Sequence, residues 1–150
     1  MPTATEIETA DRLTRRRARM LPALALIFIF QQAAYFAGQL EDGSRTVDQV
    51  KIGAWLILSV VILLALATGG FWFKPARVRA LMDDEVTRAH RTDAFRIGFV
   101  VTMLGGTALY VVTLFEPIGR GEAIHLLMTF GLAAALLRFG YLERRALKYG

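Results

Sequence analysis

Residues 52–73 read IGAWLILSVVILLALATGGFWF and carry no charged side chain anywhere along their length. A helix needs about 20 mainly apolar residues to cross the hydrocarbon core of a bilayer. Three further segments, residues 20–38, 95–115 and 122–138, are of comparable length and hold charges only near their margins. The sequence therefore predicts an all-α integral membrane protein, a four-helix bundle made of two hairpins.

The composition of the 150-residue chain agrees with a membrane protein. Hydrophobic residues make up 55% of it and charged residues 21%, whereas a soluble domain is usually roughly 45–50% apolar. The chain has no cysteine, which excludes thiol catalysis, cysteine-ligated metals and disulfides.

Lysine and arginine are distributed unevenly between the segments that flank the spans. Fifteen of the 18 precede the first span, separate the second from the third, or follow the fourth, and only Arg45, Lys51 and Arg120 lie on the other side. The positive-inside rule then places both termini in the cytoplasm. We expect a basic cytoplasmic tail at 1–19, a transmembrane domain at 20–145 with a cytoplasmic loop at 74–94, and a C-terminal tail at 146–150. The net charge of +5 follows from this orientation, so no direct nucleic-acid binding is expected.

The first span resembles a signal peptide because it follows a cluster of arginines. Tyr35 and Phe36 interrupt the small-residue pairs that would form a cleavage site. We therefore expect an uncleaved first helix. Aromatic residues near both ends of the second span, Trp55 and residues 71–73, are expected at the membrane interfaces, and Pro75 is expected to end that helix.

Small residues at a spacing of four predict close helix packing, because helices in lipid associate where their backbones can approach. Such ladders comprise Ala33 and Ala37, Ala34 and Gly38, Gly98, Thr102 and Gly106, and Gly131 and Ala135. Packing within one bundle is favoured, and a homodimer face remains an alternative. Gly69 and Gly70 predict either a hinge or a close crossing.

Polar residues inside the spans are candidates for function because their burial in hydrocarbon is costly. Gln31 and Gln32 are adjacent, so their side chains point about 100° apart and at least one should face protein. Glu122 and His125 are three residues apart and share a helix face. These four form a candidate intramembrane polar site, which serves either interhelical hydrogen bonds or contact with a ligand such as a quinone.

Catalytic and metal-binding constellations are missing from the sequence. The chain has two serines and two histidines, with no nucleophile elbow and no phosphate-binding glycine loop. A di-iron site would need a second Glu-x-x-His element, and the two histidines are expected on opposite sides of the membrane. We expect no enzymatic activity, no metal and no cofactor.

The segment before the third span predicts a helix that begins in water and runs into the bilayer. Asp83 or Asp84 should cap it, and Arg88 should pair with Asp84 and Glu85 at helical spacing. Its mixture of acidic, basic and apolar residues makes it the candidate docking site for a cytoplasmic protein partner. The residues assigned to that site are Leu81, Met82, Asp83, Asp84, Glu85, Arg88 and Arg91.

In two segments, residues 81–99 with their Asp-Asp-Glu run and residues 138–145 with the sequence RFGYLERR, the chain resembles small four-span bacterial membrane proteins of uncharacterised function. Genes for such proteins often lie beside a helix-turn-helix regulator. The resemblance implies a protein of the bacterial inner membrane that sequesters, or senses for, a cytoplasmic DNA-binding partner. Two alternatives remain: a small-molecule or quinone-binding subunit of a larger complex, and an oligomeric transporter.

Overall fold

The computed structural model describes residues 3–38, 45–69 and 83–149, and nearly all of them are helical. The helices are α1 (Ala4–Gly38), α2 (Arg45–Thr68), α4 (Glu85–Thr113) and α5 (Arg120–Tyr149). All four are long and apolar enough to cross a membrane. The predicted fold class, an all-helical four-helix bundle, is confirmed.

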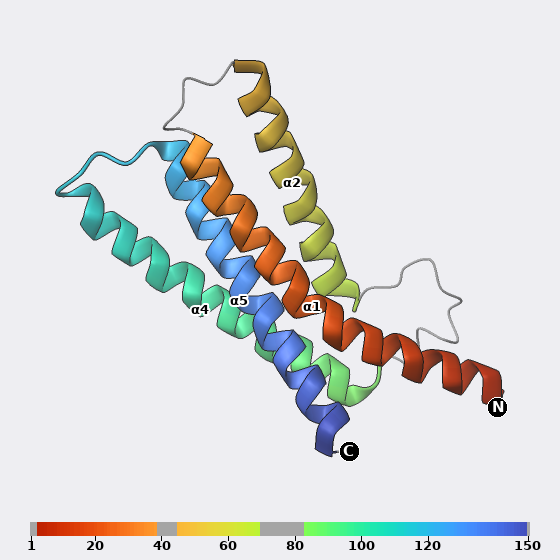
Figure 1. The fold of residues 1–150 in the computed structure, drawn as a ribbon. Coiled ribbons are helices and arrows are strands. Elements are labelled where there is room, and N and C mark those ends of the chain that lie inside the picture. The colour runs from red at the N-terminus through yellow and green to blue at the C-terminus, as the bar shows by residue number, and fades with distance from the viewer. Residues whose placement is uncertain (1–2, 39–44, 70–82, 150) are drawn as a thin grey trace.

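Figure 1 shows the two chain ends at the same end of the bundle. Helix α5 packs along both α1 and α4, while α2 lies at one side and packs chiefly on α5. We call the end that carries Arg17, Arg88 and Arg144 the basic end, and the end near Gln32 and His125 the opposite end.

Helix α1 begins 16 residues before the expected start of the first span, so the N-terminal tail is helical. Its start is a capping box: the Glu6 backbone N–H donates to Thr3 Oγ1 at 3.3 Å, and the Thr3 backbone N–H donates to Glu6 Oε2 at 2.8 Å. Helix α2 ends earlier than expected, at Thr68, because Gly69 adopts φ +74°. Residues 70–73 and Pro75 lie outside the described part of the chain.

Pro22 lies inside α1 and cannot donate a backbone hydrogen bond to Ala18. The Ala18 carbonyl instead accepts a hydrogen bond from Nε of Arg144 in α5, at 2.9 Å. The same proline ring fits against Gly140, where a Cβ atom would stand 2.9 Å from Pro22 Cγ and Cδ. The proline therefore leads to two contacts between α1 and α5, one through the Ala18 carbonyl and one through the proline ring.

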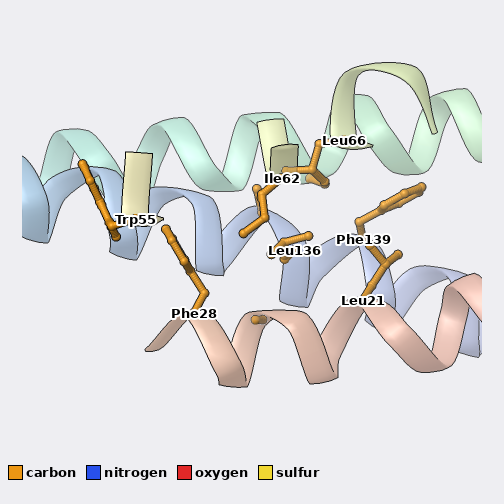
Figure 2. Close-up of a cluster of buried hydrophobic side chains, with 10 residues drawn as sticks. Leu21, Phe28, Trp55, Ile62, Leu66, Leu136 and Phe139 are labelled. Carbon is orange, nitrogen blue, oxygen red and sulfur yellow. The ribbon is translucent and has the colours of Figure 1, made fainter. Parts of the chain in front are cut away.

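The core lies between α5 and the inner faces of α1 and α2. Figure 2 shows Phe28 and Leu21 of α1 facing Leu136 and Phe139 of α5, with Ile62 and Leu66 of α2 closing the cluster. Trp55 belongs to this cluster and is buried, so its expected place as an interfacial anchor is wrong. The indole is held inside because its Nε1–H donates to Thr129 Oγ1 at 3.1 Å.

Close packing through small residues is confirmed between α4 and α5. A Cβ atom on Gly98 would lie 2.9 Å from both Ala135 Cβ and the Gly131 carbonyl oxygen. Gly106 only makes an ordinary contact with Leu127. Packing within the bundle is wrong for Ala33 and Ala34 of the ladders predicted in α1, because both are exposed in the single chain. The side chains of Ala37, Gly38 and Gly70 fall outside the described part of the structure.

Candidate functional site

A buried ion pair joins α1 to α5 at the basic end. Arg17 and Glu143 are 5% and 3% exposed. Arg17 Nη2 lies 2.5 Å from Glu143 Oε2, and Arg17 Nε donates to the same oxygen at 3.1 Å. The guanidinium also lies over the Phe139 ring, 5.4 Å from its centroid.

The ion pair is the centre of a network that reaches each of the described helices. Arg17 Nη1 donates to the Gly69 carbonyl at the end of α2 (3.2 Å), and Nη2 donates to Thr87 Oγ1 of α4 (3.3 Å). His90 Nδ1, also of α4, lies 3.1 Å from the second oxygen of Glu143. A buried charge pair is tolerated only when its remaining donors and acceptors are satisfied, and this network largely does so.

Asp83 and Asp84, two acidic residues of the predicted docking site, stabilise the first turn of α4. Asp84 is its N-cap and accepts from the Thr87 backbone N–H at 2.7 Å, which confirms the predicted helix start. Arg88 pairs with Asp83 at 3.3 Å, so its expected pairing with Asp84 and Glu85 is wrong. The cap occupies the Asp84 carboxylate, which leaves Asp83 to reach Arg88.

Asp83 contacts a second arginine, since its Oδ1 lies 3.2 Å from Arg91 Nη2 at an angle that does not make a hydrogen bond. Glu85 is exposed and makes no ion pair with a described residue. Leu81 and Met82, the apolar part of the predicted docking site, lie outside the described residues. Among the described members of that site, Asp84, Glu85 and Arg88 are exposed, and Asp84 is occupied as the N-cap of α4.

At the opposite end, a chain of hydrogen bonds links three helices. Trp55 of α2 donates to Thr129 of α5, whose hydroxyl donates to Gln32 Oε1 of α1 at 2.9 Å. All three side chains are buried, so the prediction that one of the adjacent glutamines faces protein is confirmed. Gln32 Nε2 is buried without a hydrogen-bond partner in the described part of the chain.

His125 lies one turn before Thr129 and stacks between two aromatic rings. Its ring centroid is 3.8 Å from that of Trp55 and 4.4 Å from that of Tyr35, with interplanar angles of 29° and 22°. Gln31 and His125 line the same pocket, which has a volume of about 250 Å³. Two residues of the predicted polar site therefore line one cavity, whereas Gln32 does not line it and instead accepts the hydrogen bond from Thr129.

Glu122, the fourth residue of the predicted intramembrane polar site, stabilises the start of its own helix, α5. Its carboxylate accepts a hydrogen bond from the Gly119 backbone N–H at 3.2 Å, which caps the start of α5. A separate apolar cavity of about 390 Å³ lies between α2, α4 and α5 and includes Ser59. The Ser59 hydroxyl is buried there with no partner among the described residues.

Sequence reasoning missed the buried role of Arg17 and Glu143, which are 126 positions apart. Arg17 is one of five arginines before the first span, and nothing in that cluster distinguishes it from its neighbours. The helical start of the N-terminal segment did have a signal, the Thr-x-x-Glu capping box at Thr3 to Glu6. Within the described residues, no group of three or more His, Asp or Glu is placed to hold a metal ion.

No protein-family model matches the chain, and no curated protein or solved structure is significantly similar to it.

Proposed function

We propose that this chain is a non-enzymatic multi-pass protein of the bacterial inner membrane whose basic end faces the cytoplasm and binds a protein partner. The partner class that the sequence resemblance implies is a helix-turn-helix transcriptional regulator, held at the membrane by this contact. The observation that carries the proposal is the buried Arg17–Glu143 network, which fixes the protruding helix ends in one arrangement.

The surface that would receive the partner consists of helix ends at the basic end, which we call the platform: residues 4–19 of α1, 85–91 of α4 and 143–148 of α5. Exposed apolar side chains on it, Ile7, Val86 and Leu147, offer area for burial. Arg88 and Glu85 add exposed charge of both signs. Charges on such a surface orient a partner and speed its encounter more than they add affinity.

Anionic lipid is the competing ligand of the platform, because each Lys or Arg near a membrane surface contributes about 1 kcal/mol to lipid attraction. A substitution at Glu85 distinguishes a protein partner from anionic lipid as the ligand of the platform. Replacement of Glu85 by lysine strengthens attraction to lipid but removes an acidic contact from a protein interface. Asp83 and Asp84 are unsuitable for this test because they hold the start of α4.

The test begins with purification in mild detergent and identification of the copurifying protein, which should carry a helix-turn-helix domain. Binding of that purified partner is then measured on nanodiscs that contain the wild-type chain, Glu85→Lys or Glu116→Lys. Glu116 is also exposed and lies between α4 and α5, away from the platform, so its variant is a matched charge change outside the proposed interface. We expect Glu85→Lys alone to weaken partner binding by about tenfold, the loss of one charged hydrogen bond.

Equal partner binding by all three chains in uncharged nanodiscs would show that Glu85 and the start of α4 do not take part in the interface. Recovery of no regulator with the wild-type chain would contradict the proposal as a whole.

A further inference from the structure

The pocket at the opposite end combines polar groups with stacked rings. It lies between α1, α2 and α5, and Gln31, Tyr35, Lys51, Trp55 and His125 provide its polar and aromatic lining. Val50, Ala34 and Ala54 complete the wall. Ligand sites typically have this composition, an apolar and aromatic cavity with a few polar groups that fix orientation.

His125 is the feature that packing alone does not explain. The residue is only 5% exposed, and no hydrogen bond joins its ring nitrogens to a described residue. These nitrogens are nevertheless not among the fully buried atoms that lack a partner, and His125 lines the pocket. A molecule that enters the pocket can therefore hydrogen-bond to the imidazole, which an apolar ring stacked in the same place would not allow.

The size and the surroundings of the pocket define the class of that molecule. Its volume of about 250 Å³ is just below the roughly 300–1,000 Å³ of sites for drug-sized ligands, so it fits a single substituted ring. Helix α2, which forms one wall, packs mainly on α5, and the cavity belongs to spans that are apolar enough for a membrane. The ligand must therefore be lipid-soluble.

We infer that this pocket binds the ring of a lipid-soluble quinone, independently of the docking proposed for the basic end. The flat ring lies against the aromatic side chains, where stacking contributes beyond the buried area. The ring carbonyls accept hydrogen bonds from the Gln31 amide and from the imidazole of His125. The apolar tail of the quinone extends into the surrounding lipid.

Fluorescence of Trp55 reports occupancy directly, because a quinone in contact with an indole quenches its emission. Trp72 is first replaced by phenylalanine, which leaves Trp55 as the single tryptophan. The chain is then placed in nanodiscs and titrated with a short-chain substituted benzoquinone. Quenching should saturate at a stoichiometry of one quinone per chain.

Two adjacent alanines provide a matched pair of variants. Ala34 lines the pocket whereas Ala33 does not, and both are exposed, so neither substitution disturbs the core. Ala34→Phe should abolish saturable quenching, and Ala33→Phe should leave it unchanged. Gln31→Leu, which preserves size but removes the amide, should weaken binding by about tenfold, the loss of one hydrogen bond.

Quenching that rises linearly with quinone and is the same in both phenylalanine variants would show partition into lipid only, and it would overturn the inference. Saturable quenching that Gln31→Leu does not weaken would remove Gln31 from the site and contradict the proposed recognition. Thermal melting of each variant shows that the chain is folded. If Ala34→Phe melts early, Gln31→Leu alone decides between these outcomes.

Discussion

Arg17 and Glu143 are energetically coupled because each makes the burial of the other tolerable. Removal of one partner from a buried ion pair leaves an uncompensated charge and typically costs about 3–5 kcal/mol. Replacement of both partners by apolar residues is often much less damaging. The network at the basic end should therefore show strong non-additivity.

We expect Arg17→Met and Glu143→Leu each to lower the free energy of unfolding in detergent by about 3 kcal/mol. The double variant should lose much less than the sum of the two. Arg15→Met is the control: Arg15 lies two residues away in the same helix and is exposed, so its loss should change stability by at most about 0.5 kcal/mol. Additive losses would mean that the two side chains do not interact.

At the scale of residues, the sequence predicts local relationships better than distant ones. The helical rotation between Gln31 and Gln32 predicts that one glutamine faces protein, and the position of Asp84 predicts the cap of α4; both are confirmed. The stacking of His125 on Tyr35 and Trp55 depends on how three helices meet. No spacing along one helix contains that information.

At the scale of elements, the crossing of α4 and α5 depends on Gly98. A Cβ atom there would meet the Gly131 carbonyl, which is backbone and cannot rotate away. Gly53 in α2 has no atom within 4 Å of an added Cβ. The same substitution at these two helical glycines should therefore change stability in opposite directions.

We expect Gly98→Ala to destabilise the bundle by about 1–3 kcal/mol through overpacking. Gly53→Ala should stabilise it by about 0.5–1 kcal/mol, because alanine has the higher helix propensity. Unfolding in detergent, followed by circular dichroism, measures both effects. If Gly98→Ala also stabilises the chain, α4 and α5 do not cross closely at this position.

The existence and type of all four helices follow from the sequence because each apolar segment is long enough to span a bilayer. The helix boundaries are less well predicted. Helix α1 continues into polar sequence since a capping box, and not a change in hydropathy, sets its start. The small-residue rule predicts packing within the bundle correctly for Gly98 and Gly131 but not for Ala33 and Ala34, because spacing does not specify which face meets another helix of the same chain.

At the scale of the whole molecule, both chain ends and the start of α4 lie at the basic end (Figure 1). The network around Arg17 connects all four helices there. The pocket lined by His125 lies at the other end. Helix α2 reaches both sites, through Trp55 at the pocket and through Gly69, which directly follows the helix, at the network. A helix that packs chiefly on one neighbour is the element best placed to respond to occupancy of that pocket.

The orientation of the molecule in the membrane is the last prediction. Reporter fusions after residues 43 and 118 should report the outer side, and fusions after residues 83 and 150 the cytoplasm. The reason is the positive-inside rule, since 15 of the 18 lysines and arginines precede the first span, separate the second span from the third, or follow the fourth. Residues 43 and 150 lie outside the described part of the chain, but reporter activity does not depend on their local structure.

The orientation test has an internal control. Because four spans put both chain ends on one side, the fusions after residues 83 and 150 must agree with each other and differ from those after 43 and 118. An outer-side signal from the fusions after residues 83 and 150 would show that the molecule has the opposite orientation. The platform would then lie on the side of the membrane away from any cytoplasmic regulator. The quinone pocket would survive that result, since a lipid-soluble ligand reaches it through the bilayer in either orientation.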